Sequence, residues 1–130
     1  MQLSPGVRVA RVYDPPAPTD GVRILVDRLW PRGLSKQAAA LDLWCRQVAP
    51  STELRTWYGH APERFAEFDS RYRAELDEPE RAAALAALAE QSARQTITLL
   101  TATKALDLSH AAVLARLLSE PAPPAPPSST

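Results

Sequence analysis

The sequence predicts an α/β fold: a small, three-stranded, mainly parallel sheet covered by about five helices. Short β-branched and apolar runs alternate with longer segments of helical periodicity, an order typical of a parallel sheet with helical cover. One of these runs, Ile24 to Val26, is continuously apolar, as in a strand covered on both faces. The chain has 130 residues, of which 45% are hydrophobic and 23% charged, enough to bury the core of one domain.

Three segments have the composition of strands. The first spans residues 7–13 and stops within residues 14–21, because the prolines there lack a backbone donor and Asp-Gly favours a turn. The second spans residues 23–29, and the third spans residues 96–101, which are again β-branched and apolar. Since three strands make a small sheet, the helices must supply much of the core.

The segments between the second and third strands have helical spacing. Ser35 is the predicted cap of a helix through about Gln47, a stretch that includes Trp44 and Cys45. A short helix follows, with Ser51 or Thr52 as its predicted cap, and ends at Gly59, since glycine readily adopts the left-handed conformation that closes a helix. These patterns place the helical cover in the middle of the chain.

Three further helices complete the predicted order. Residues 62–76 place aromatic and leucine side chains at spacings of three and four, and residues 77–80 resemble a capping box before an alanine-rich helix. The last helix is predicted over residues 108–119, with Asp107 or Ser109 as its cap.

The chain is expected to form a single domain over residues 1–119, followed by a disordered, proline-rich tail over residues 120–130. The tail has nothing to bury and favours an extended, polyproline-like conformation. The alternative role of the tail is to bind a partner that recognises proline-rich segments.

Charge and cysteine content narrow the function classes. Fifteen basic residues balance 15 acidic ones, so no global field favours nucleic acid or an anionic membrane as a partner. A single cysteine excludes an intrachain disulfide, and no signal pattern or membrane-spanning apolar stretch is present, so we expect a soluble, cytoplasmic protein. The sequence contains no paired metal-ligand motif and no glycine-rich nucleotide loop, so we expect no metal and no cofactor. The oligomeric state stays open.

Polar residues gather where the second predicted strand ends. Asp27, Arg28, Trp30 and Arg32 follow the apolar run, and open α/β sheets bind ligands beyond the carboxyl ends of their strands. Guanidinium groups offer paired donors to phosphate or carboxylate, and tryptophan can stack on a planar ligand. The structural alternative is that Asp27 pairs with an arginine and that Trp30 packs in the core.

A second polar group follows the third predicted strand and opens the last helix. It comprises Thr101, Thr103, Lys104, Ser109 and His110. If the second and third strands are neighbours in a parallel sheet, this group lies at the same edge as the first. A helix start there adds backbone donors and a partial positive charge, both favourable for an anion.

We therefore predict a site for a small anionic ligand, a phosphorylated small molecule or a nucleotide. Arg28, Arg32 and Lys104 would hold the anion, while Asp27 and His110 would act as catalytic acid–base or orienting groups. A non-catalytic regulatory or interaction module is the competing hypothesis. The residues leave the choice between an enzyme and a binding module open.

Four stretches carry a family resemblance. Residues 11–16, 20–33, 49–55 and 101–114 together resemble the short bacterial branch of the domain-of-unknown-function 488 family. The resemblance implies a small α/β domain and no established activity. Longer members of that family carry a Cys-His-Arg triplet at the entry to the last helix, where this chain has Ser109, His110 and Ala111. Chemistry that depends on that thiol is therefore not expected here.

Overall fold

The computed structural model describes residues 6–119 and has a four-stranded parallel sheet at its centre. The tail predicted over residues 120–130 lies outside the described residues. The strand order is β1-β4-β2-β3, all neighbours are parallel, and the strands span Val7–Arg11 (β1), Val22–Leu25 (β2), Leu43–Trp44 (β3) and Ile97–Thr101 (β4). The predicted α/β class is confirmed, with one strand more than expected.

The sheet register brings the ends of three strands to one edge. β4 is buried throughout and pairs with β1 up to Arg11 opposite Thr101, and with β2 up to Leu25 opposite Leu100. The connections that follow β1, β2 and β4 therefore leave the sheet side by side. The second and third predicted strands correspond to β2 and β4, and they are neighbours in the parallel sheet, which is the condition the predicted site required.

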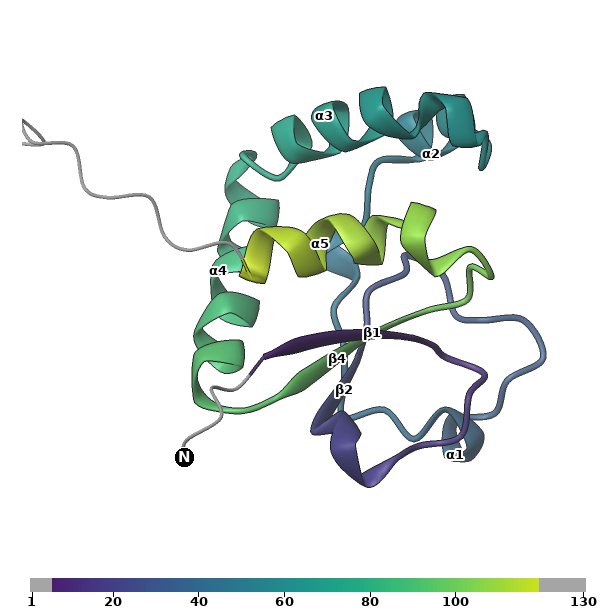
Figure 1. Ribbon diagram of the computed structural model, residues 1–130, viewed down its shortest axis with the longest axis vertical. Coiled ribbons are helices and arrows are strands. Elements are labelled where there is room, and N and C mark those ends of the chain that lie inside the picture. The colour runs from purple at the N-terminus through teal and green to yellow at the C-terminus, as the bar shows by residue number, and fades with distance from the viewer. Residues whose placement is uncertain (1–5, 120–130) are drawn as a thin grey trace, which may run out of the picture.

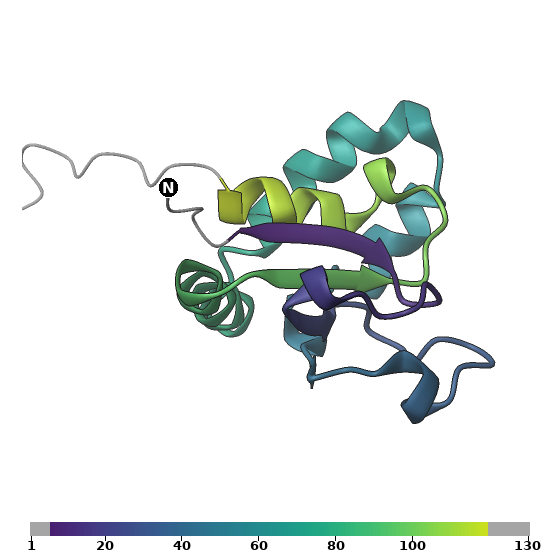
Figure 2. The ribbon, with the colours of Figure 1, turned by 60° about the horizontal axis from the view of Figure 1, so that its bottom comes forward.

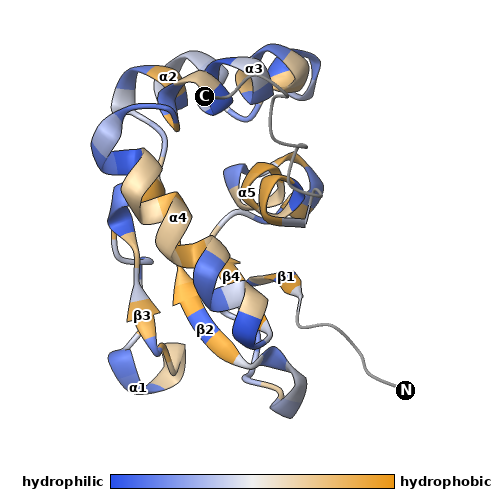
Figure 3. Ribbon diagram, turned by 90° about the vertical axis from the view of Figure 1, so that its left-hand side faces the viewer, coloured by the Kyte–Doolittle hydropathy of each residue, from blue (hydrophilic) through white to orange (hydrophobic). Residues whose placement is uncertain are grey.

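Helices cover mainly one face of the sheet. They span Lys36–Ala39 (α1), Thr52–Tyr58 (α2), Phe65–Glu75 (α3), Pro79–Arg94 (α4) and His110–Ser119 (α5) (Figure 1). Figure 2 shows α5 along one side of β1 and β4, with α1 on the opposite side of the sheet. Hydrophobic colour is concentrated in the strands and in α5, whereas α2 and α3 are more hydrophilic (Figure 3).

Two apolar clusters lie on the two faces of the sheet. The larger packs Ile24 and Leu99 against the buried residues of α3, α4 and α5. The smaller is built around Leu25 and Leu100 and is closed by loop residues, including Trp30 and Trp44. No helix within residues 6–119 has the length and apolar character needed to cross a membrane.

The helix predicted over residues 35–47 is wrong. Only α1 is α-helical there; Ala40 then adopts a left-handed conformation (φ 49°), and the chain turns back to form β3 before a short 3-10 helix, Arg46–Val48. The Asp42 carboxylate accepts the Arg23 N–H at 2.8 Å, and the Cys45 N–H donates to the last residue of β2 at 2.8 Å. Pairing with a buried strand therefore overrides the local helical pattern.

Several boundaries also differ from the predictions. β1 ends at Arg11 and β2 at Leu25, both earlier than expected, because the following residues bend into the loops that form the sheet edge. The predicted capping box is absent, since α4 begins after Glu78 without a side-chain cap. Ser51 does cap α2, and Gly59, with φ 53°, does end it.

Candidate functional site

Asp27 and His110 meet at the carboxyl edge of the sheet. Asp27 lies just beyond β2, and His110 is the first residue of α5. The Asp27 Oδ1 atom is 3.3 Å from His110 Nε2, and the Ala102 N–H donates to Asp27 Oδ2 at 2.9 Å. His110 Nε2 also lies 3.0 Å from the Val26 carbonyl oxygen, which can only accept, so this ring nitrogen bears the hydrogen. The Asp27 carboxylate thus links the end of β2 to the residue after β4, through Ala102, and to the start of α5, through His110.

The Asp27 carboxyl group is held in its ionised form. Burial by itself raises its pKa, but the hydrogen bond and charge of His110, the Ala102 N–H and the Thr101 hydroxyl together outweigh burial and lower the pKa below its usual value. The Trp44 indole N–H fixes the same residue by donating to its carbonyl oxygen at 2.8 Å. Asp27 is therefore a firmly placed negative charge at neutral pH.

A cavity of about 800 Å³ opens beside this pair. Its walls come from the loops after β2 and β4 and from α2 and the residues around it. Buried side chains of Tyr58 and Phe68 line its inner part; their rings stack with centroids 4.3 Å apart, and the Tyr58 hydroxyl donates to the Leu108 carbonyl oxygen at 2.7 Å. The inner part thus combines the apolar surface of these two rings with the Asp27 carboxylate, and the Tyr58 hydrogen bond ties it together across the cavity.

Four exposed cations line the same cavity, against a single carboxylate. They are Arg28 and Arg32 from the loop after β2, Arg55 from α2, and Lys104 from the loop after β4. The one acidic side chain of the lining is Asp27. This excess of positive charge is local, because the whole chain has a formal net charge of zero.

Most lysine and arginine side chains within residues 6–119 have a partner in the chain, whereas most of those that line the cavity have none. Within residues 6–119, four of the 15 lysine and arginine side chains make no hydrogen bond, ion pair or ring contact, namely Arg32, Lys36, Arg55 and Lys104. Three of these four line the cavity. Arg28 differs, since its guanidinium contacts the Thr52 hydroxyl.

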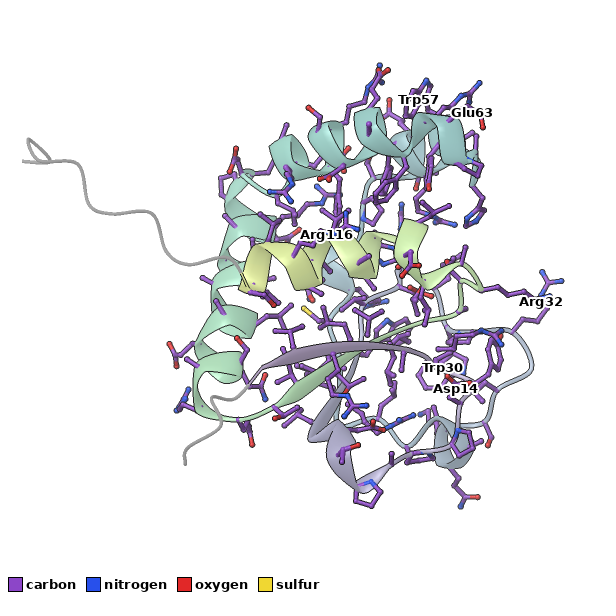
Figure 4. All side chains as sticks on the ribbon, in the orientation of Figure 1. Asp14, Trp30, Arg32, Trp57, Glu63 and Arg116 are labelled. Carbon is purple, nitrogen blue, oxygen red and sulfur yellow. The ribbon has the colours of Figure 1, made fainter. Side chains whose placement is uncertain are left out.

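The remaining predicted site residues have other positions and partners. Trp30 lines the cavity, but its N–H donates to the Leu34 carbonyl oxygen at 2.7 Å and its ring lies edge-on to Trp44, which agrees with the structural alternative. Arg32 is among the lining residues, and Figure 4 shows its side chain extending outward from its loop. Ser109 lines the cavity as well.

Two of the predicted ligand-binding hydroxyl groups are used by the backbone. The Ser109 hydroxyl donates to the Leu106 carbonyl oxygen at 2.6 Å and accepts the Ala112 N–H at 3.2 Å, so it is the cap of α5. Thr101 is fully buried, lies outside the lining and accepts the Thr103 N–H at 3.3 Å. Thr103 itself does line the cavity. The structure thus gathers the predicted residues at one edge without exposing Thr101 there.

Sequence reasoning missed Arg55 and His60. Both are exposed and line the cavity, Arg55 from α2 and His60 from just after it. The sequence placed Arg55 only within residues 49–55, one of the four stretches that resemble the family. Because no local signal tells which part of the sheet a short helix faces, the sequence held no direct pointer to either residue.

Comparison with known proteins shows relatives over nearly the whole described chain. The model of a family described as the inactive DUF488-N3 subclade matches residues 6–126. The uncharacterized protein Rv3073c of Mycobacterium tuberculosis is 54% identical over 113 residues, covering 87% of this chain and 93% of the relative. The uncharacterized protein YeaO of Escherichia coli is 44% identical over 109 residues, covering 84% and 93%. No solved structure matches the chain.

The resemblance noted in the four sequence stretches is therefore confirmed across the domain. Given the match over residues 6–126 and two bacterial relatives aligned over 93% of their lengths, the chain belongs to the DUF488 family, in the subclade described as inactive.

Proposed function

We propose that this domain binds a small phosphorylated anion at the carboxyl edge of its sheet. The observation that carries the proposal is the set of three cations, Arg32, Arg55 and Lys104, that line one cavity and have no partner within residues 6–119. A charge without a partner gains little for the fold, whereas several charges around one concavity attract an anion and raise its local concentration.

The chemistry of these groups favours phosphate. A guanidinium presents a planar fork of donors that matches phosphate oxygens, and a lysine ammonium adds a mobile point charge. The start of α5 contributes less than its position suggests, because the Ser109 hydroxyl already accepts one of its free N–H groups at 3.2 Å. The cationic side chains, rather than the helix start, are therefore the main anion-binding groups.

Binding without turnover fits the site better than catalysis. The serine at position 109 is fully used as a helix cap, and the family is described as inactive. His110 Nε2 is committed to the Val26 carbonyl oxygen and to Asp27, so the pair serves to hold the two strand ends at fixed positions. We propose a positioning role for Asp27 and His110 in place of the catalytic role.

A thermal-shift titration with inorganic phosphate and pyrophosphate tests the proposal. The chain offers a matched pair of variants, because Lys36 and Lys104 are both exposed and unpartnered within residues 6–119, and only Lys104 lines the cavity. Phosphate at saturation should raise the stability of the wild type and of Lys36→Gln by roughly 1–4 kcal/mol. Lys104→Gln should respond less. Equal responses of all three proteins, or no response, would show that the cavity is not an anion site.

A further inference from the structure

Exposed apolar side chains gather at the same cavity as the free cations. Within residues 6–119, the large apolar side chains that are exposed are Tyr13 (40%), Leu29 (65%) and Leu43 (44%); Tyr13 also donates its hydroxyl to the Arg32 carbonyl oxygen and lies under the Arg11 guanidinium. Tyr13 and Leu29 line the cavity, whereas Leu43 lies on the edge strand β3. A single exposed leucine is ordinary, but two such side chains at one concavity indicate a surface that gains from being covered.

The cavity is also divided by depth. Its cations are exposed at the rim, while buried side chains of Ala49, Tyr58 and Phe68 line its interior. The one charged carboxylate, Asp27, is part of this interior, with its side chain 17% exposed. An anionic group placed deep in the cavity would be repelled by Asp27, so it belongs at the rim, with any apolar part of the ligand directed inward.

We propose that the ligand is a phosphate monoester whose phosphate is joined to an apolar, ring-sized body. This inference rests on the proposed anion site and adds the nature of the body. A cavity of about 800 Å³ that is open to solvent has room for a small organic molecule, and it is far larger than an inorganic anion requires. The dianionic charge of a phosphate monoester matches several rim cations better than the single charge of a carboxylate does.

Isothermal titration calorimetry with three probes separates the parts of this proposal. Inorganic phosphate reports the anion site alone, phenyl phosphate adds the ring, and benzoate keeps the ring but replaces the phosphate. Phenyl phosphate is expected to bind the wild type about tenfold or more tighter than either of the other probes, because burial of a ring removes apolar surface from water.

Two leucine variants show whether the gain arises at this cavity. Leu29→Ser should lower the affinity ratio of phenyl phosphate to inorganic phosphate several-fold, whereas Leu43→Ser, an exposed leucine outside the cavity, should leave it unchanged. Equal affinity for phenyl phosphate and inorganic phosphate would overturn the proposed body and leave the anion site standing. Failure of both phosphates to bind would overturn the anion site itself. Tight binding of benzoate would overturn the preference for phosphate.

Discussion

Positive charge is buried and paired at the start of β2, but it is exposed beyond the end of that strand. At its start, the Arg23 side chain is 5% exposed; its Nη1 atom lies 2.7 Å from Asp20 Oδ2, and its other nitrogens donate to the carbonyl oxygens of Ala39 and Ala40 at 3.0 and 3.1 Å. Beyond the end of β2, the arginines of the cavity are exposed, and the Arg32 guanidinium has no partner within residues 6–119. The positive charge at the start of β2 stabilises the fold, whereas the positive charges beyond its end remain available to a ligand.

The difference gives a physical criterion for separating structural from binding charges. A buried charge is costly unless it is paired and hydrogen-bonded, and the charge of Arg23 finds its partners within the chain. An exposed charge loses little by remaining unpaired, so its position in a concavity is the informative feature. The free energy of unfolding should therefore depend on Arg23, and ligand affinity should depend on the rim cations.

The largest expected effect is that of removing the buried arginine. Arg23→Met leaves the Asp20 carboxylate buried without its partner, which should lower the free energy of unfolding by about 3–5 kcal/mol in urea denaturation. The matched control is Arg94→Met, because Arg94 pairs with Glu90 on the surface, where the cost should be about 0–1 kcal/mol. Similar losses for both variants would remove the distinction between the two ends.

A smaller effect is expected for the carboxylate at the far end of β2. Asp27→Ala leaves the Ala102 N–H without its acceptor and removes the partner of His110, which should cost about 1–3 kcal/mol. Asp27→Asn retains a carbonyl acceptor and should recover part of that loss. If urea denaturation shows both variants to be as stable as the wild type, the pair does not hold the strand ends.

Acid should weaken the fold through the same carboxylates. Asp20 and Asp27 both have pKa values below the usual value, Asp20 chiefly because the Ala17 N–H donates to it. A lowered folded-state pKa gives stability that is present above the unfolded pKa of about 3.9 and is lost as the pH falls through the folded value. In urea denaturation between pH 6 and pH 3, Asp27→Asn should therefore lose less stability than the wild type. Parallel curves would contradict the lowered pKa of Asp27.

The smallest effect on stability is expected at the rim of the cavity. Arg55→Gln and Lys104→Gln remove side chains that have no partner within residues 6–119, so the free energy of unfolding should change by no more than about 0.5 kcal/mol. Removing like charges that face one cavity can even raise it slightly. A loss comparable to that of the buried arginine would show that these cations serve the fold.

The sequence predicted where the candidate site lies better than it predicted which residues line it. Strand ends are marked by the change from apolar to polar residues, and parallel neighbours share an edge, so Asp27 and His110 were expected to meet there, and they do. Arg55 lies on a helix whose pattern shows only that the position is exposed. The edge that a short helix faces depends on tertiary packing, which no local pattern records.

The unexpected strand has a similar cause. Residues 35–47 have helical spacing, but Asp42 and Cys45 gain backbone hydrogen bonds with β2 only once that strand is in place. The same limit applies to Thr101, whose position at a strand end suggested a ligand contact although its side chain is buried. Periodicity predicts elements and faces, whereas pairing across 20 or more residues is decided by the assembled core.

The most direct test of where an anion binds is a backbone-amide NMR titration of the full chain with phenyl phosphate. Binding at the carboxyl edge predicts that the largest shift changes fall in the loops after β2 and β4 and in α2, at the amides of residues 28–30, 32, 52–56 and 102–105. It also predicts that α1, which carries the equally free Lys36, stays unperturbed. Shift changes centred on α1, spread evenly over the surface, or absent at saturating ligand would contradict the assignment of this cavity as the binding site.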